Sequence, residues 1–202
     1  MKKVVAPPSP EAPPLPPRER ILAAARDLFY RHGIRAVGVD AIAEAAGTNK
    51  MTLYRHFASK DMLVAEYLRL LAAEADARWD QMAKYHPGDP QNQLEAWLRH
   101  VEDVVTHGGE RGCALANAAV ELPDKEHPAR RVIEEQKTRQ RERLVALCRD
   151  AGFTEPERLA DEVFLLFEGA RVSIQSVGRS GPASRLIGML RSLFSEHPRQ
   201  QG

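Results

Sequence analysis

Residues 48–60 hold a group of polar side chains whose spacing could support recognition of DNA. At the start of this stretch lie four hydrogen-bond donors: Thr48, Asn49, Lys50 and Thr52. Donors at the first turn of a helix can reach base edges in the major groove, and the Lys50 ammonium suits guanine acceptors or a phosphate. Further along are groups suited to the phosphate backbone: Tyr54, His56 and Lys60. The pattern predicts that these seven residues contact DNA.

A sharp turn between two short helices would position these donors. We expect one helix over residues 39–46, a break at Gly47 and a second helix over residues 50–57. Glycine allows the backbone to turn sharply, and the small side chains of Ala43 and Ala46 allow the two helices to approach closely. Four larger apolar side chains are expected in the core beneath the two helices: Phe29, Ile42, Leu53 and Phe57. The sequence therefore predicts a helix-turn-helix.

This segment and the helix before it closely resemble the DNA-binding domain of the TetR family of bacterial repressors. The matching residues are Leu28-Phe29, Gly33, Ile42-Ala43, Ala46-Gly47, Thr52-Leu53-Tyr54-Arg55-His56-Phe57 and Ser59-Lys60. The strong likeness covers residues 18–67, and a weaker one covers residues 112–124. The resemblance implies that Thr52, Tyr54, His56 and Lys60 contact DNA, and that Asn49 and Lys50 read bases.

One position departs from the pattern of the family. Many members have Thr or Ser before the second helix, where the hydroxyl touches a phosphate, whereas this chain has Gly38. Glycine caps a helix tolerably but brings no hydroxyl, so a phosphate contact at Gly38 would use the backbone amide.

The rest of the chain is predicted to be all-α, with about nine helices in total, because apolar residues recur at spacings of three and four and Gly, Pro or capping residues separate the segments. We expect three parts: a flexible proline-rich arm over 1–17, the DNA-binding domain over 18–64, and a helical ligand-binding and dimerisation domain over 65–202. Lys2 and Lys3 of the arm could touch a DNA groove, although a featureless tail explains them as well. Thr154 and Glu157 are expected to form a capping box.

Two C-terminal segments carry apolar stripes that fit a dimer interface. Helices expected over about 155–177 and 182–195 would pair with the same helices of a second copy and form a four-helix interface. The alternative is that both helices belong to the core of one subunit. The resemblance favours a homodimer that reads two half-sites.

A small-molecule pocket is expected among the fourth to eighth helices. The candidate lining is Trp79, Trp97, Leu115, Phe164 and Phe167, with polar groups His100, Asn117, Glu121 and Glu168 to orient a ligand. Aromatic residues at helical spacing also occur in ordinary cores, so each of these residues has a purely structural alternative.

Composition excludes several classes of protein. No apolar run approaches the roughly 20 residues of a membrane-spanning helix, and two distant cysteines, Cys113 and Cys148, fit a reducing compartment, so we expect a cytoplasmic protein. The formal net charge is +1. Residues 1–60 nevertheless carry ten basic and five acidic side chains, which gives a basic head on an acidic body. We expect no metal site, because the most suggestive residues have no compact ligand spacing: His100, His107, Cys113, Glu121 and His127.

These observations predict a transcriptional repressor that a small-molecule effector releases from an inverted-repeat operator, with no cofactor. Two alternative functions fit the sequence less well. A nonspecific DNA binder fits poorly with the net charge, and an enzyme would need a nucleophile with its base, a phosphate loop or metal spacing, none of which is found. The operator, the regulated genes, the effector and the direction of regulation stay open.

Overall fold

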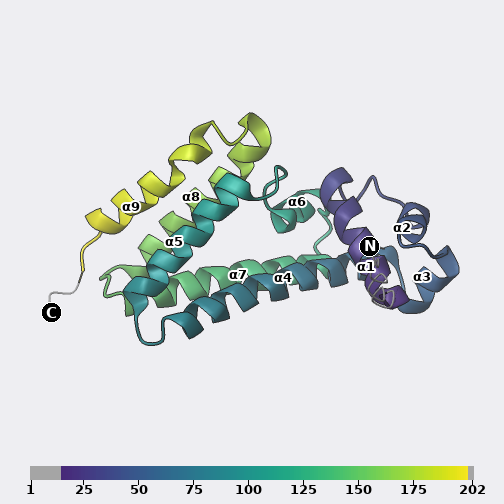
Figure 1. Cartoon of the computed structure of the whole chain (residues 1–202), viewed down its shortest axis with the longest axis horizontal. Coiled ribbons are helices and arrows are strands. Elements are labelled where there is room, and N and C mark those ends of the chain that lie inside the picture. The colour runs from purple at the N-terminus through teal and green to yellow at the C-terminus, as the bar shows by residue number, and fades with distance from the viewer. Residues whose placement is uncertain (1–14, 200–202) are drawn as a thin grey trace, which may run out of the picture.

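The structure, a computed structural model, describes residues 15–199 and consists of helices joined by short connections (Figure 1). Among these residues the only strand-type pairing is an isolated bridge between Phe153 and Arg199. The α-helices within the described range are α1 (Pro17–His32), α2 (Val39–Ala45), α3 (Lys50–His56), α4 (Lys60–Tyr85), α5 (Pro90–His107), α6 (Ala114–Glu121), α7 (Pro128–Asp150), α8 (Pro156–Val177) and α9 (Leu186–Glu196). The all-α prediction with about nine helices is confirmed.

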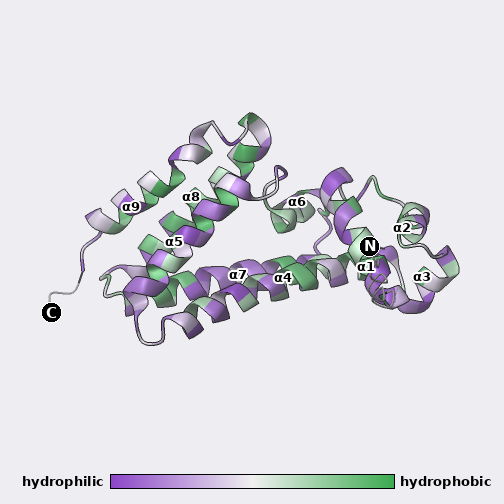
Figure 2. Ribbon diagram, viewed as in Figure 1, coloured by the Kyte–Doolittle hydropathy of each residue, from purple (hydrophilic) through white to green (hydrophobic). Residues whose placement is uncertain are grey.

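The molecule is elongated, with α1, α2 and α3 at one end and α5, α8 and α9 toward the other. The two long helices α4 and α7 lie side by side and connect the ends, and α6 sits between α1 and the body (Figure 1). Hydrophobic and hydrophilic residues alternate around α4, α7 and α8 in Figure 2, as expected for helices with one buried side.

Local sequence explains most helix boundaries. Pro17 opens α1, where its missing N–H costs nothing, and α1 ends at Gly33, whose φ of 87° suits glycine. The Ser59 hydroxyl accepts a 3.1 Å hydrogen bond from the Met62 amide at the start of α4. The Asp89 carboxylate accepts a 3.0 Å hydrogen bond from the Asn92 amide at the start of α5. These caps satisfy donors that the first helical turn leaves unpaired.

Two boundary predictions are corrected by the structure. Helix α8 begins at Pro156 after Glu155 without a side-chain cap, so the expected capping box of Thr154 and Glu157 does not form. Instead the Thr154 amide and hydroxyl both donate to the Pro198 carbonyl, at 3.1 and 3.2 Å, because the C-terminal segment packs against this turn. The last predicted helix is also divided, since Pro182–Arg185 form a 3₁₀ turn, η1, before α9.

The buried residues form two hydrophobic clusters. The first, here the head core, joins α1, α2, α3 and the beginning of α4 to α6 and the first turns of α7 through Ala118, Ala129 and Val132. The second, here the body core, joins α5, the later part of α7, α8, η1 and α9. Because the head core includes α6 and α7, the division at residues 64 and 65 stays a prediction, and most of the expected arm, 1–14, lies outside the described residues.

Candidate DNA-binding surface and ligand cavity

The turn between α2 and α3 has the geometry that its residues predict. Gly47 has a φ of 60°, in the left-handed region that favours glycine. The Thr48 amide donates a 2.9 Å hydrogen bond to the Ala43 carbonyl, which closes the turn. Ala43 and Ala46 are buried, as is Leu53 on the inner side of α3. These buried contacts fix the position of α3, so its outer side is presented to solvent in a defined orientation.

Asn49 is the N-cap of α3. Its side-chain oxygen accepts a 2.9 Å hydrogen bond from the Thr52 amide. That contact fixes the start of the helix and leaves the side-chain NH₂ as the group with which Asn49 can approach a base. The predicted base reader thus also has a structural role, which spacing alone did not show.

Lys50 and its neighbour Met51 project from the first turn of α3. The Lys50 ammonium lies 3.2 Å from a carboxylate oxygen of Asp40 on α2, and both side chains are exposed. Met51 is 73% exposed. An exposed apolar side chain at this position suits contact with a thymine methyl group, and sequence analysis did not single it out. The sequence could have indicated Met51, because it lies between Lys50 and Thr52, two predicted DNA contacts.

The remaining predicted DNA contacts lie around this turn. Tyr54 is 44% exposed and His56 is exposed, whereas Thr52 and Lys60 are half-buried. Burial lowers the pKa of the Lys60 ammonium, opposed by the nearby carboxylates of Asp61 and Glu121. Gly38 caps α2 with extended backbone and no side-chain bond, as expected for a residue without a hydroxyl. Their contact with DNA stays a prediction.

A cavity of about 670 Å³ lies between the head core and the body core. Six helices line it: α1, α4, α5, α6, α7 and α8. Six of the predicted pocket residues contribute to its wall: Trp79, Trp97, His100, Leu115, Phe164 and Phe167. Its volume falls in the range of sites for drug-sized molecules.

Three predicted pocket residues are not among the lining residues, and each has another partner. The side-chain amide of Asn117 donates a 2.7 Å hydrogen bond to the Arg111 carbonyl. The Glu121 carboxylate accepts a 2.9 Å hydrogen bond from the Arg35 amide, so it joins α6 to the segment between α1 and α2. Glu168 pairs at 2.7 Å with Lys137.

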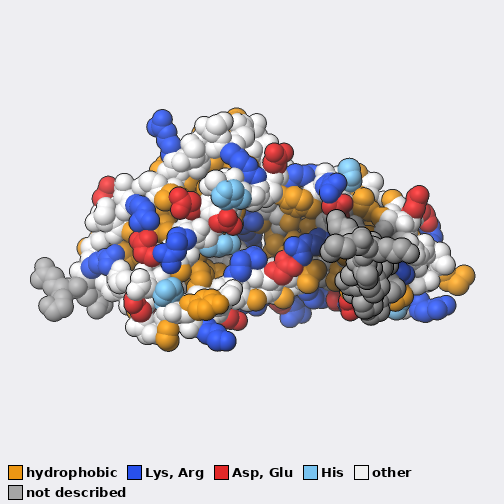
Figure 3. Space-filling model, in the orientation of Figure 1, with side chains coloured by type: hydrophobic (Ala, Val, Ile, Leu, Met, Phe, Trp, Pro, Cys, Tyr) orange, Lys and Arg blue, Asp and Glu red, His pale blue; other side chains and the backbone are white. Residues whose placement is uncertain are grey.

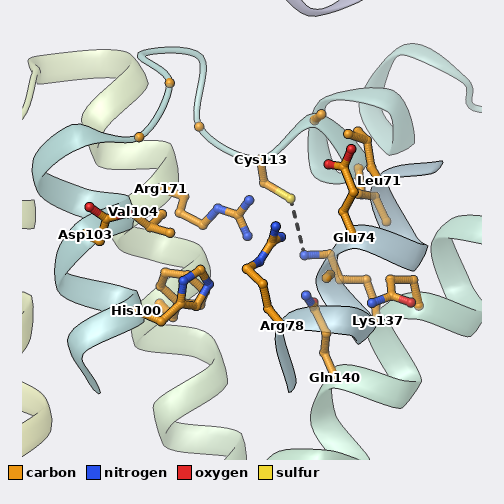
Figure 4. Close-up of a pocket in the computed structure, with 18 of the residues that line it drawn as sticks. Leu71, Glu74, Arg78, His100, Asp103, Val104, Cys113, Lys137, Gln140 and Arg171 are labelled. Atoms are coloured by element: carbon orange, nitrogen blue, oxygen red, sulfur yellow. Dashed lines mark hydrogen bonds between the residues drawn. The ribbon is translucent and has the colours of Figure 1, made fainter. Parts of the chain in front are cut away.

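Several lining residues were not anticipated. Arg26 and Tyr30 come from α1, the first helix of the predicted DNA-binding domain. Figure 4 shows the long side chains of Arg78, Lys137 and Arg171 converging from α4, α7 and α8. Each helix contributes one such residue, so no local sequence pattern could have indicated the group.

The residues that invited a metal interpretation do not assemble. His100 and Cys113 both line the cavity, but residues 15–199 hold no cluster of three or more His, Cys, Asp or Glu able to hold a metal ion. The Cys113 sulfur is the N-cap of α6 and accepts a 3.4 Å contact from the Lys137 ammonium. Cys148 lies in the body core, where burial raises the pKa of its thiol to about 12.

Apolar side chains remain exposed on α8 and α9. Leu165 is 69% exposed and Val172 59%, while Met189 on α9 is 50% exposed. Gly169 lies between the first two, and a Cβ built on it would meet no atom within 4 Å. Leu165, Gly169 and Val172 of α8 and Met189 of α9, here the exposed stripe, thus form a set of exposed small or apolar residues.

Known proteins match this chain in two ways: in sequence over its N-terminal helices, and in fold over most of its length. Residues 21–67 match the family described as "Bacterial regulatory proteins, tetR family". The chain is 34% identical over 96 residues to the HTH-type transcriptional regulator AcrR of Shigella flexneri, covering 46% of this chain and 44% of that protein. It is 42% identical over 95 residues to the HTH-type transcriptional activator FasR of Mycolicibacterium smegmatis, covering 46% and 42%. The matched stretch spans less than half the length of these two relatives.

A solved structure extends the likeness beyond the head. The crystal structure of a TetR-family transcriptional regulator from Streptomyces coelicolor has a TM-score of 0.82 and 27% identity, covering 89% of this chain and 94% of that one. The proteins named in these three matches are all transcriptional regulators. In the described part of the chain no helix is long and apolar enough to span a bilayer.

Proposed function

We propose that this chain is a DNA-binding transcriptional regulator of the TetR family, since residues 21–67 match that family and its fold resembles that of a TetR-family regulator. More specifically, we propose a cytoplasmic, dimeric repressor that a small molecule releases from an inverted-repeat operator. The observation that carries the proposal is the position of the cavity. Its wall includes Arg26 and Tyr30 of α1, and α1 packs directly against α2 and α3. A molecule in the cavity would therefore act on the helix that supports the DNA-binding surface.

Close contacts around α1 support this coupling. A Cβ at Gly109 would lie 1.8 Å from the Tyr30 hydroxyl oxygen, so the loop before α6 approaches α1 as closely as glycine permits. The Arg111 guanidinium donates to the Arg31 carbonyl at the end of α1, and Glu121 accepts from the Arg35 amide. Displacement of this loop or of α6 would be transmitted to α1 through these contacts.

The exposed stripe on α8 and α9 supports dimerisation. Leu165→Glu combined with Val172→Glu should convert a dimer to a monomer, because burying carboxylates in an apolar interface is costly. Light scattering measures the mass. Val120→Glu is the matched control, since Val120 is 83% exposed on α6, away from the stripe. An unchanged mass in the double variant, or monomers with the control, would count against this interface.

Selection of bound duplexes from a random DNA pool tests the central claim. A regulator with two symmetric recognition helices should enrich an inverted repeat whose half-sites are about one helical turn apart. Recovery without an enriched motif would contradict sequence-specific regulation and favour nonspecific binding. On the face shown in Figure 3, Lys and Arg are interspersed with Asp and Glu, so this face has no broad basic patch for nonspecific binding.

The direction of regulation needs a second measurement. One relative is named an activator, so the names do not decide between repression and activation. In a transcription assay with the selected operator placed over a promoter, the protein should lower transcript yield. An increase would show that the protein is an activator.

A further inference from the structure

The cavity carries more positive than negative charge at one end. Arg78, Lys137 and Arg171 reach this end from three helices, and their side chains converge in Figure 4. Among residues 15–199 the one carboxylate paired with them is Glu168, at 2.7 Å from Lys137 and 3.4 Å from Arg171. The cluster, here the cationic end, therefore holds three cations against one carboxylate.

The other acids at the cavity wall are committed elsewhere. Glu74 is paired with Arg26, and Asp27 lies 2.8 Å from Arg31 on its own helix. Asp103 lies 3.1 Å from the His107 ring. None of these carboxylates has an ion pair with the cationic end within the described chain, so the excess positive charge is not neutralised locally.

Arg78 and Arg171 bring guanidinium groups to the cavity, and Arg171 has a buried donor without a partner. The Arg78 side chain is exposed, lines the cavity and has no ion pair within the described range. The Arg171 Nε–H is buried without a partner, although the same side chain reaches Glu168 and stacks 5.1 Å from the Phe167 ring. Buried donors are costly unless a partner satisfies them, and guanidinium groups match carboxylates in a bidentate geometry.

His100 adds polarity without adding charge. Burial lowers the pKa of its imidazole, and the positive charge of Arg78 lowers the pKa further, with Arg171 acting in the same direction and Asp103 against it. The ring is therefore neutral at pH 7 and can donate or accept one hydrogen bond at the edge of the cationic end.

Much of the remaining cavity wall is apolar and aromatic. Trp79, Met82, Trp97, Leu144 and Phe164 line it, and all belong to the body core or pack against it. A fully inorganic anion would leave this wall unfilled, whereas a neutral apolar molecule would leave the guanidinium donors unpaired. The wall and the cationic end together favour a molecule with one apolar part and one anionic part.

We propose that the cavity binds an organic carboxylate, with its charged group between Arg78, Lys137 and Arg171 and its hydrocarbon or aromatic part against the tryptophans. This inference rests on the proposed function in taking the cavity as the effector site. Binding would add a second carboxylate beside Glu168, so that three cations face two acids.

Matched acids and amides provide the test. The probes are decanoate with decanamide and hydrocinnamate with hydrocinnamamide, pairs that differ mainly in charge. The chain has two tryptophans, Trp79 and Trp97, and both line the cavity, so intrinsic fluorescence reports its occupancy without DNA. In each pair the acid should bind about tenfold more tightly than the amide, because hydrogen bonds between charged groups are the stronger kind.

Two variants and one control sharpen the result. Arg78→Gln and Lys137→Gln should each weaken binding of the acids about tenfold and leave the amides unchanged. Arg131→Gln is the control, because Arg131 is an exposed residue of α7 that pairs with Glu135 on the outer surface. Equal binding of acid and amide, failure of both acids to change the fluorescence, or equal effects of all three variants would overturn the inference.

The readouts separate this inference from the proposed function. Anisotropy of labelled operator measures release from DNA, whereas tryptophan fluorescence measures only the cavity. Acids that bind without releasing DNA would support the carboxylate site and contradict the release mechanism. A chain that binds no specific DNA would contradict the proposed function, while the fluorescence titration would still decide the ligand class.

Discussion

The DNA-binding surface and the cavity arrange their polar groups in opposite ways. At the surface the candidate contacts lie within residues 48–60, apart from Gly38, and most point outward with weak local partners. In the cavity the charged groups come from separate helices. Lys137 and Arg171 are about one-fifth exposed, whereas Arg78 is exposed at the cavity wall. The first region presents donors to a polyanion in solvent, and the second holds donors in a partly dry space.

Packing and function are therefore separate at the DNA-binding surface and shared at the cavity. The outer side of α3 contributes little to the core, whereas the cavity wall is also the surface of the body core. Substitutions at the two regions should therefore differ in how they divide between stability and binding.

The largest expected effect is on stability at the cavity wall. Trp97 is 3% exposed and makes an edge-on contact with Phe167. Trp97→Ala should lower the free energy of unfolding by about 3–5 kcal/mol, measured by urea titration. Met51→Ala on the outer side of α3 should change it by less than about 0.5 kcal/mol. Similar losses for both variants would show that the outer side of α3 contributes as much to stability as the cavity wall.

The next effect concerns recognition of sequence. Lys50→Ala should reduce discrimination at one base pair by about 1–3 kcal/mol, because Lys50 lies at the first turn of α3. Anisotropy with specific and altered duplexes measures this difference. A uniform loss across all duplexes would instead make Lys50 a phosphate contact.

Lys60 should behave differently from Lys50. Lys60→Ala should weaken binding to all sequences alike and reduce the salt slope by about one, because a single phosphate contact is lost. A series of salt concentrations with specific and random DNA gives both quantities. A selective loss on specific DNA would reverse the division of labour between the two lysines.

A smaller effect should have the opposite sign. Asp40→Asn removes the carboxylate that holds Lys50 and should tighten DNA binding by less than about fivefold, since exposed ion pairs are weak. Glu44→Gln removes an exposed acid from the same helix and serves as the control. Equally tighter DNA binding by both variants would indicate a general effect of removing negative charge, and not an effect of the Lys50–Asp40 pair.

The smallest expected effect is a pH dependence at the cavity. The pKa of His100 is lowered from its usual value near 6.5. The unfolded state therefore binds more protons in the window below 6.5, and stability falls as pH falls through it. Chemical denaturation at pH 7 and pH 5 should show a smaller loss for His100→Gln than for His32→Gln, a change at an exposed residue. Equal losses of stability in the two variants would show that His100 is not the source of the pH dependence.

The fold was largely predictable because its signals are local. Helix starts at Pro17, Ser59 and Asp89 follow from residues within one turn, and Gly47 marks the recognition turn by itself. Thr154 was misinterpreted because its partner, the Pro198 carbonyl, lies 44 residues away.

The candidate sites divide in the same way. The helix-turn-helix was recognisable from one short stretch of sequence. The capping role of Asn49 is seen only in the structure, where its side-chain oxygen accepts a hydrogen bond from the Thr52 amide. The cavity was only half-predicted, since its aromatic residues carry a compositional signal while Arg78 and Arg171 resemble ordinary surface charges in the sequence. Glu121 shows the same limit, because its partner Arg35 is 86 residues away.

Helix α4 begins beside the recognition helix and passes along the cavity, and its length gives it mechanical leverage. Its 26 residues extend over about 39 Å at 1.5 Å per residue. A tilt of roughly 5° about one end would carry the other end through about 3.4 Å, the rise of one base pair along a DNA strand. A rotation of this size would thus place a half-site contact out of step by a full nucleotide.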